Sequence, residues 1–350
     1  MFTPQSTLST RIVSLLTTIA ESKAIIDRAV ILPKNEIRLR RQAKIRMTHS
    51  STEIEGNILN LRQVEDILAN KKIDAPERDI YEVENYLKAL KYIETIVQDK
   101  KPISEKTLLK IHGLVTYKTL PKERSGKYRQ IPIYIVRRQY GIPDEVIYTG
   151  PEATSVPDLC KDLFAWLNLS ETQQINPVLV AGIIHQEIAA IHPFVDGNGR
   201  TARAMATLVL YARGYDFRKL FALEDYYNKD RPSYYSAISI GKDYAQRRVD
   251  FTPWLEYFIQ GFKEEIDAVK AQITTLSIKG QENSPRIYLE KDQLTILDFI
   301  GQMGRITVTD VIDILSCPRR TAQSKLSKLK SLSIIQQTGS GRSAAYILNK

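Results

Sequence analysis

Apolar residues recur at spacings of three and four through most of the first hundred residues. The repeat is clearest in residues 61–72 and 77–101, and it is typical of amphipathic helices that bury one face. Pro102 ends the second stretch, and Ser104 is placed to cap a further helix that runs to about residue 115. The N-terminal part of the chain is therefore predicted to be helical.

The pattern changes between Gln130 and Thr149, where Ile, Val and Tyr are frequent and Gly141 and Pro143 lie near the centre. Such a run is typical of two strands joined by a turn. Because a lone hairpin is only marginally stable in water, this one is expected to lie on the helical body. We predict one β-hairpin inside a mainly helical protein.

The most apolar segments of the chain, 176–191 and 200–214, have helical periodicity. The first begins with Asn-Pro, a frequent helix start, and the second ends in glycine, a frequent helix stop. Between them the chain reads HPFVDGNGRTAR, from His192 to Arg203. This motif is predicted to be a loop between two buried helices, with the second helix beginning at about Gly199 or Arg200.

The chain from residue 286 onward has the pattern of a separate small domain. Three helical stretches are followed by two short apolar runs around a Gly-Ser-Gly turn. The order helix, helix-turn-helix and β-wing predicts a winged helix. We expect an N-terminal helical region at 1–100, a core at 101–262, a helix and linker at 263–285, and the winged helix at 286–350.

Composition narrows the class of protein. Hydrophobic residues make up 43% of the chain and charged residues 26%, as in globular proteins, and no apolar run is long enough to span a membrane. The N-terminus lacks a basic segment before a long apolar stretch, so we expect a cytoplasmic protein without a membrane partner. Cys160 and Cys317 lie far apart, which argues against both a disulfide and a zinc site.

The formal net charge is +10 and favours anionic partners, namely nucleotide phosphates, nucleic acid or an acidic protein. From Pro285 to Lys350 there are ten Lys and Arg against five Asp and Glu, a net charge of +5 for the tail. That excess is compatible with phosphate contacts of the winged helix. Charge alone does not choose among these partners.

The central motif combines groups that suit an anion. A helix that begins after Gly199 exposes unpaired N–H groups and the positive end of its dipole. Gly197 lets the backbone approach a phosphate, and the Asn198 side-chain amide can point at the same oxygens. Arg200 and Arg203 lie three residues apart, so they are expected on one helix face, each binding a phosphate oxygen.

Two further residues of the motif suggest the chemistry. Asp196 supplies a hard oxygen ligand, which suits Mg²⁺ that bridges phosphates. His192, at the end of the preceding helix, is placed to remove a proton from an attacking group. Together these residues predict transfer of a phosphoryl or nucleotidyl group to a hydroxyl.

The motif resembles the signature of the Fic (filamentation induced by cAMP) family of protein adenylyltransferases, HPFx[D/E]GNGRxxR, at every fixed position. The stretch SGKYR and the hairpin at 126–152 look like the family's flap. The helical N-terminus and the winged helix suit a bacterial-type architecture within the family. The resemblance implies a mainly α fold, with a Fic-type helical core, a β-hairpin flap and a C-terminal winged helix.

The resemblance also implies roles for the residues of the signature. His192 would deprotonate a Tyr, Thr or Ser hydroxyl of a target protein, which attacks the α-phosphate of ATP, and Phe194 would anchor the loop in the core. Asp196 would bind Mg²⁺, and the flap would hold the target by strand-like pairing. The expected ATP-binding residues are Gly197, Asn198, Gly199, Arg200, Thr201, Ala202, Arg203, Asn228 and Tyr235.

A second motif lies upstream of the signature. Ser51 and Glu55 fit the family's inhibitory pattern [S/T]xxxE[G/N], in a helix expected at about residues 44–57, and they lie one helical turn apart. In the family this glutamate pairs with the second arginine of the signature, here Arg203. The resemblance therefore implies that Glu55 withholds Arg203 from the γ-phosphate and inhibits the enzyme.

Several alternatives stay open at this stage. The same residues suit removal of AMP from a target, transfer of another nucleotide, or a degenerate, inactive core. A different class is a DNA-binding regulator whose core senses ATP, and the winged helix could instead dock a protein, including a second copy of the chain. Self-modification is a further outcome of the same chemistry. His49, His112 and His185 are expected to form local hydrogen bonds only.

Overall fold

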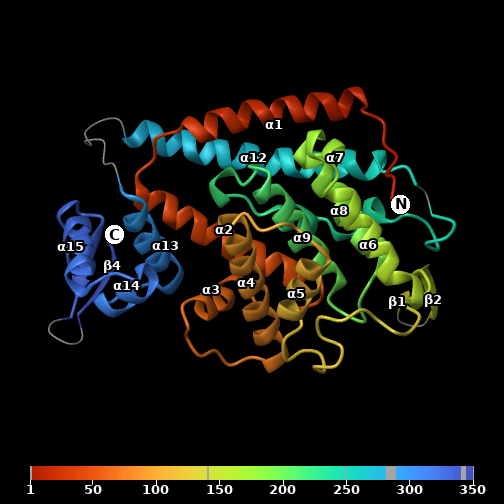
Figure 1. The fold of residues 1–350 in the computed structure, drawn as a ribbon, viewed down its shortest axis with the longest axis horizontal. Helices are drawn as coiled ribbons and strands as arrows, with labels where there is room; N and C mark the ends of the chain where they lie inside the picture. The colour runs from red at the N-terminus through yellow and green to blue at the C-terminus, as the bar shows by residue number, and fades with distance from the viewer. Residues whose placement is uncertain (1, 140–141, 248, 281–288, 340–343, 350) are drawn as a thin grey trace.

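The computed structural model describes residues 2–139, 142–247, 249–280, 289–339 and 344–349. A large helical body carries the flap at one end and the winged helix at the other (Figure 1). No helix in these ranges is both long enough and apolar enough to cross a membrane. The expected mainly α fold is confirmed.

The N-terminal region is helical, as expected. Its helices are α1 (Thr10–Arg28), α2 (Pro33–Glu53), α3 (Leu61–Leu68), α4 (Glu77–Gln98) and α5 (Glu105–Val115). Ser104 caps α5 in a reciprocal capping box with Thr107, as the sequence predicts. The helix α2 begins earlier than the expected inhibitory helix at 44–57 and ends at Glu53, so Glu55 lies in the turn that follows it.

The central helices surround the signature loop. They are α6 (Val156–Leu167), α7 (Ser170–Gln174), α8 (Pro177–Ile191), α9 (Asn198–Ala212), α10 (Leu223–Lys229), α11 (Arg231–Ile238) and α12 (Thr252–Gly280), with short 3₁₀ turns at Ala153–Ser155 and Phe217–Lys219. The helix α12 runs without a break across residue 262, where the sequence suggested the end of the core, and it lies beside α1 (Figure 1).

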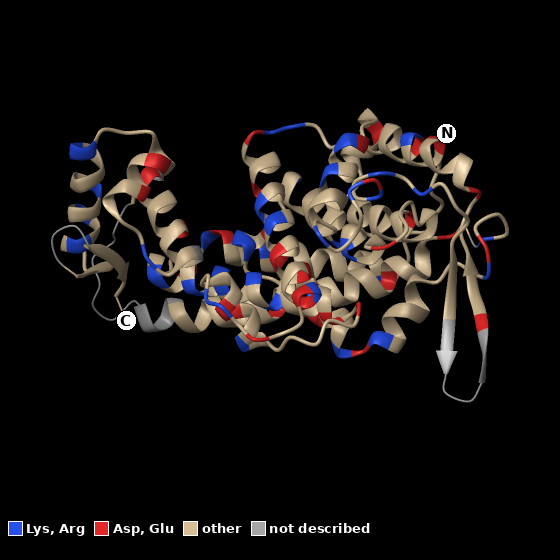
Figure 2. Cartoon of the chain, turned by 90° about the horizontal axis from the view of Figure 1, so that it is seen from below, with Lys and Arg blue, Asp and Glu red and all other residues tan. Residues whose placement is uncertain are grey.

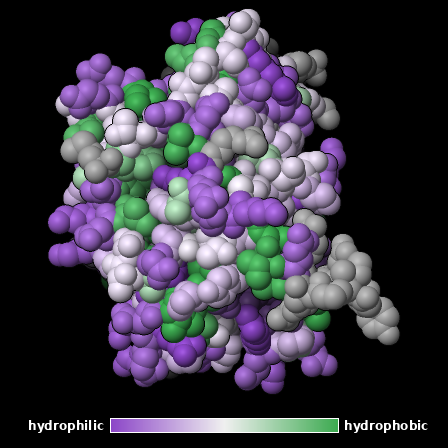
Figure 3. Space-filling view, turned by 90° about the vertical axis from the view of Figure 1, so that its right-hand side faces the viewer, coloured by the Kyte–Doolittle hydropathy of each residue, from purple (hydrophilic) through white to green (hydrophobic). Residues whose placement is uncertain are grey.

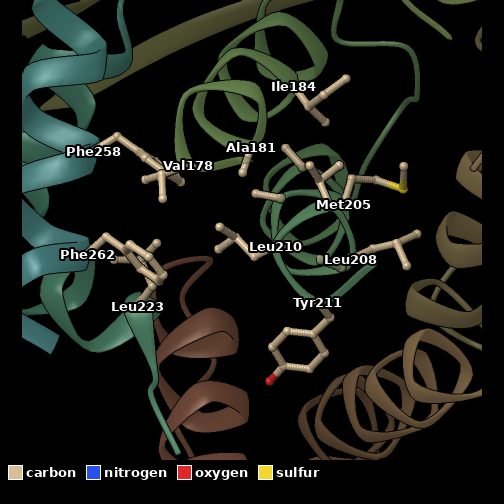
Figure 4. Close-up of a cluster of buried hydrophobic side chains, with 14 of the residues drawn as sticks. Val178, Ala181, Ile184, Met205, Leu208, Leu210, Tyr211, Leu223, Phe258 and Phe262 are labelled. Atoms are coloured by element: carbon tan, nitrogen blue, oxygen red, sulfur yellow. The ribbon is translucent and has the colours of Figure 1, made fainter. Parts of the chain in front are cut away.

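Helices α8 and α9 form the centre of the core. Asn176 accepts a hydrogen bond from Val178 N and begins α8, as expected. Both helices are buried on nearly every side, and their apolar residues pack against α10 and α12 (Figure 4). A loop held between two such helices has little freedom to move, so the signature residues are fixed by the core itself.

The flap consists of β1 (Tyr134–Gln139) and β2 (Ile142–Thr149), which pair antiparallel with Tyr134 opposite Thr149. The expected hairpin is therefore present, although β1 starts four residues later than predicted. The Tyr148 hydroxyl donates to Ala190 O at 2.6 Å, and Thr149 N donates to Lys242 O at 2.8 Å. These contacts attach the base of the flap to α8 beside the signature loop and to the segment that follows α11.

The winged helix has its own hydrophobic core. It contains α13 (Lys291–Met303), α14 (Val308–Leu315), α15 (Arg319–Ser331), β3 (Ile335–Thr338) and β4 (Ala345–Leu348). Ile37 of α2 belongs to this core, and Arg41 of α2 donates to Gly301 O at 2.7 Å. One helix, α2, therefore joins the winged helix at its N-terminal end to the signature loop at its C-terminal end.

Candidate active site

A cleft opens where the signature loop meets the flap, the C-terminal end of α2 and α11. Its lining includes the side chains or backbone of Glu55, Ile133, Val136, Val146, Tyr148, His192, Asp196, Gly197, Asn198, Gly199, Arg203, Tyr234 and Tyr235. The fold thus gathers residues from positions 55 to 235 around one helix N-terminus. The flap forms one wall, so a chain that pairs with it would lie beside His192.

His192 ends α8 in a left-handed conformation, with φ 49°, which turns its ring out of the helix. Arg129 holds this turn, because its Nε donates to His192 O at 2.9 Å. The ring Nδ1 lies 3.2 Å from Ala189 O, and a carbonyl can only accept, so Nδ1 carries the proton. Nε2 therefore has a lone pair available to accept a proton.

Burial lowers the pKa of His192 from its usual value, against opposing contributions from the Ala189 carbonyl and Glu55. The ring is thus neutral at pH 7. A neutral imidazole with a free Nε2 is the form that general base catalysis needs.

The loop is braced from inside by Asn198. Its Oδ1 accepts from Phe194 N at 2.9 Å, and its Nδ2 donates to Phe194 O at 2.8 Å. Both polar atoms of the side chain contact the Phe194 backbone, and Asn198 also lines the cleft, so its expected contact with phosphate oxygens stays a prediction. Phe194 is fully buried, as expected for an anchor.

His112 supports the same loop from α5. Gly126 N donates to its Nδ1 at 2.9 Å, so Nε2 carries the proton and donates to Asp196 O at 3.0 Å. Its ring stacks on Phe194 with a centroid distance of 3.6 Å, and burial lowers its pKa to about 4. His112 therefore has only local partners, as predicted, and it fixes the backbone at Asp196.

The other two histidines also have local partners. His185 Nε2 lies 3.0 Å from the Tyr234 hydroxyl, and His49 Nδ1 lies 3.6 Å from Glu53 Oε2. Burial lowers the pKa of His185 well below its usual value. Neither lies among the residues that line the cleft.

The N-terminus of α9 opens into the cleft. Gly197 has φ 77°, and a Cβ there would lie 2.8 Å from Thr116 Cγ2. A Cβ at Gly199 would collide with the Glu55 carboxylate. The absence of side chains therefore lets a carboxylate lie directly over the helix N-terminus, where the dipole and the first N–H groups favour a negative charge.

Glu55 and Ser51 together hold Arg203. Glu55 Oε1 lies 2.8 Å from Arg203 Nη2, which also donates to Ser51 O at 2.8 Å, and Arg203 Nε donates to Ser51 Oγ at 3.0 Å. Burial opposes ionisation of Glu55, but Arg203 and Arg200 lower its pKa below the usual value. The carboxylate is therefore charged and occupies the position that an anionic ligand of Arg203 would need.

Arg200 turns away from the cleft. Its Nη1 lies 3.1 Å from Glu82 Oε1 of α4 and its Nη2 lies 3.5 Å from Asp196 Oδ1. Arg200 is not among the residues that line the cleft. In this structure Arg200 faces Glu82 and Asp196, whereas Arg203 faces Glu55, and the expected contact of Arg200 with phosphate stays a prediction.

Asp196 is the residue that could hold Mg²⁺. Its carboxylate is partly exposed at the edge of the cleft, and Oδ1 accepts from Gly197 N at 2.6 Å. In the described ranges, no three His, Cys, Asp or Glu residues gather as a metal site. Mg²⁺ is commonly bound by one carboxylate, with phosphate and water oxygens in its remaining coordination positions. Asp196 therefore fits this ion.

Asn228 and Tyr235, expected at the nucleoside, contact α2 and the turn that follows it. Asn228 Nδ2 donates to Glu53 Oε2 at 2.5 Å, and the Tyr235 hydroxyl donates to Ile54 O at 3.2 Å. Tyr235 also lines the cleft, whereas Asn228 does not. Thr201 and Ala202 are buried in the first turns of α9, and Thr201 Oγ1 donates to Gly197 O at 2.7 Å.

Sequence reasoning missed two groups of supporting residues. Arg129 lies in the quoted SGKYR stretch, and its basic side chain just before the hairpin was a signal that went unused. Arg78 and Glu82 of α4 contact Asp196 and Arg200. Nothing in their helical pattern distinguishes them from surface residues, because their partners lie more than a hundred positions away.

The helical core, the neutral histidine and the open N-terminus of α9 form an arrangement that suits a phosphate-containing ligand beside a base. The sequence model of the Fic/DOC family matches residues 102–210, which span α5, the flap, α8, the signature loop and most of α9. This region of the chain is therefore similar to the Fic/DOC family.

Known relatives agree with this assignment. A protein adenylyltransferase Fic of Culex quinquefasciatus is 33% identical over 181 residues, which cover 51% of this chain and 34% of that protein. A protein of the same name from Nematostella vectensis is 26% identical over 268 residues, or 74% of this chain and 56% of that protein. The chain thus spans about a third to a half of these relatives.

A solved structure resembles the whole chain. The Fic family protein from Desulfovibrio desulfuricans G20 is 26% identical and has a TM-score of 0.64, and the match covers 99% of this chain and 98% of that chain. The fold of Fic-1 from C. elegans is also similar, with 23% identity and a TM-score of 0.59 over 75% of this chain and 72% of that chain.

Proposed function

We propose that the protein is a cytoplasmic protein adenylyltransferase that transfers AMP from ATP to a Tyr, Thr or Ser hydroxyl of a target protein or of itself. The observation that carries this proposal is the lone pair of His192 Nε2 beside the N-terminus of α9. The names of the relatives support the same activity.

The chemistry of the chain's own residues is a proton transfer and a substitution. His192 accepts the proton of the target hydroxyl. The hydroxyl oxygen then bonds to the α-phosphorus of ATP, and the bond between that phosphorus and the oxygen that bridges to the β-phosphate breaks, so diphosphate leaves. The first N–H groups of α9 and Arg203 would hold the phosphate oxygens. Mg²⁺ held by Asp196 would neutralise part of the phosphate charge.

The flap is the proposed binding site of the target. Ile133 and Val136 of one side of the hairpin and Val146 of the other line the cleft, and Val136 and Val146 are also exposed. Figure 3 shows the end of the molecule that carries the flap, where hydrophobic groups are interspersed with hydrophilic ones. Main-chain pairing along an exposed strand would hold many target sequences, because it uses few side chains.

The proposed reaction has a direct test. Incubation of the Glu55→Gly variant with a cell lysate and Mg²⁺ is expected to label proteins from ATP that carries the isotope in the α-phosphate, and not from ATP labelled in the γ-phosphate. Labelling from the γ-labelled ATP alone would indicate phosphoryl transfer, and equal labelling from both would indicate that the whole triphosphate is retained. Release of label from a previously modified protein, without new labelling, would favour the alternative in which the same site removes AMP.

A second candidate function, contact with duplex DNA, rests on the winged helix. Basic residues follow the outer side of α15 (Figure 2), and Arg319, Arg320, Lys328 and Lys330 are exposed. Arg319 and Arg320 stand in the first turn, where the helix dipole disfavours cations by about 0.3–1 kcal/mol. The N-terminal part of such a helix is also the part that enters the major groove of DNA.

We expect the full-length protein to bind duplex DNA at low salt, and the Arg319→Ala, Arg320→Ala double variant to bind at least about tenfold more weakly. The matched control is Lys161→Ala, an exposed residue on α6 at the other end of the molecule (Figure 1). Fluorescence anisotropy of a labelled duplex over a range of salt concentrations measures both. Failure of the wild-type protein to bind at low salt would rule out this function, and a dimer formed through this surface would favour protein docking by α15.

A further inference from the structure

Four alternating charges form a closed ring around Asp196. Arg78 Nη2 lies 3.2 Å from Asp196 Oδ2, and Arg78 Nε lies 3.2 Å from Glu82 Oε1. The same Glu82 oxygen lies 3.1 Å from Arg200 Nη1, and Arg200 Nη2 lies 3.5 Å from Asp196 Oδ1. Each carboxylate therefore contacts both arginines.

The ring has a buried side and an exposed side. The side chains of Arg200 and Glu82 are 2% and 6% exposed, whereas those of Asp196 and Arg78 are 36% and 65% exposed. Breaking a buried ion pair leaves an uncompensated charge, so the Arg200–Glu82 contact is expected to persist. An exposed pair contributes little, so the Arg78–Asp196 contact can be exchanged at low cost.

Local helix energetics do not account for the position of Arg78. It is the second residue of α4, where the helix dipole disfavours a cation. Arg78 also precedes Glu82 by four residues. In such a pair the more favourable order places the acidic residue first, so this order is the less favourable one. The contacts of Arg78 with the ring, including Asp196 on another element, are what stabilise a cation at this position.

We propose that Arg78 occupies the cation position at Asp196 when no metal-nucleotide is bound, and that it is a positioning residue that sets the affinity of the site for a divalent cation. The inference rests on the proposed function and deepens it. A guanidinium and a divalent cation compete for the same carboxylate oxygens, so only one of them contacts Asp196 Oδ2 at a time.

The ring is also linked to the inhibitory segment. Glu82 Oε2 accepts a hydrogen bond from Asn57 Nδ2 at 3.0 Å, two residues beyond Glu55. Glu55 and Arg78 act on different residues of the signature loop, because Glu55 contacts Arg203 and Arg78 contacts Asp196. Removal of Glu55 alone therefore leaves Arg78 in place, and the effect of Arg78 is to be measured with and without Glu55.

The test measures cation binding rather than transfer. Binding of Mn²⁺ to the full-length protein is titrated by electron paramagnetic resonance, with a saturating ATP analogue that cannot be cleaved between the α- and β-phosphates. Arg78→Gln is expected to lower the dissociation constant of Mn²⁺ by about two- to fivefold, the change that corresponds to loss of one exposed ion pair. The expectation holds in the wild-type and Glu55→Gly backgrounds.

Two variants serve as controls. Lys88→Gln removes the same charge from the same helix, in an exposed pair with Glu84, and is expected to leave the dissociation constant unchanged. Asp196→Asn is expected to abolish the bound signal, which assigns it to this carboxylate.

Each other outcome overturns the inference. These are an unchanged or weaker affinity in Arg78→Gln, an equal gain in Lys88→Gln, or no bound Mn²⁺ in either background. If the Mn²⁺ affinity shifts as expected but no variant transfers AMP, the proposed function fails and the role of Arg78 stands.

Discussion

Replacement of Glu55 by glycine is expected to raise the initial rate of AMP transfer by about ten- to a hundredfold, which corresponds to removal of about 1.4–2.8 kcal/mol of competition. The physical reason is that the Glu55 carboxylate contacts Arg203 at 2.8 Å and covers the N-terminus of α9. Without it, both cationic elements are available to the phosphates of ATP. The rate is measured with α-labelled ATP, at equal protein concentration and in the presence of Mg²⁺.

Two comparisons separate the effect of the Glu55 charge from the effect of its side-chain volume. Glu55→Gln keeps the size of the side chain and removes its charge, so it is expected to raise the rate less than Glu55→Gly. ATP is expected to raise the melting temperature more in Glu55→Gly than in wild type, since the ligand then replaces the lost partner of buried Arg203. A rate that stays at the wild-type level in Glu55→Gly would refute autoinhibition by this residue.

Replacement of His192 by alanine is expected to lower the rate of the activated Glu55→Gly protein by about 10²–10⁴-fold, the usual contribution of a general base. The affinity for ATP is expected to stay within about threefold, because Arg203 and the helix N-terminus hold the phosphates without help from the imidazole. Transfer assays and calorimetric titration with ATP measure the two quantities. A large loss of ATP affinity with little loss of maximal rate would contradict the role of His192 as the base.

The pH profile adds an independent measurement. The base acts in its neutral form, and burial lowers the pKa of His192 below its usual value. The rate of the Glu55→Gly protein is therefore expected to increase with pH through a midpoint below 6.5, the unperturbed value, and to be constant near pH 7. A midpoint above 6.5 would mean that another group limits the rate.

The contacts around the signature loop show which pairs of residues could be predicted from the sequence. The resemblance to the family placed Glu55 opposite Arg203, and the two side chains are in contact. The spacing of Arg200 and Arg203 also suggested a common phosphate-binding face. In the structure the two arginines have different partners, because Glu82 of α4 and the segment of Ser51 and Glu55 at the end of α2 approach α9 from different directions.

For Asn198 and Asn228 the sequence did not predict the hydrogen-bond partners of the side chains. A sequence motif indicates that an amide is near a ligand, but it does not show which backbone groups compete for that amide. Asn198 is taken by Phe194, its neighbour across one turn of the loop, and Asn228 by Glu53 of α2. The partner of Asn198 lies within the same motif, whereas Glu53 becomes a neighbour of Asn228 only after the chain has folded.

The sequence by itself determined the features that depend on neighbouring residues: the helical periodicities, the Asn-Pro start of α8, the hairpin, the winged helix and the order of groups in HPFVDGNGRTAR. These follow from local propensity, from capping and from the burial of apolar faces, all of which act over a few residues. The tertiary structure decided which acid each arginine contacts. Such pairs join residues far apart along the chain, and a buried charge must find its partner among whatever elements pack around it.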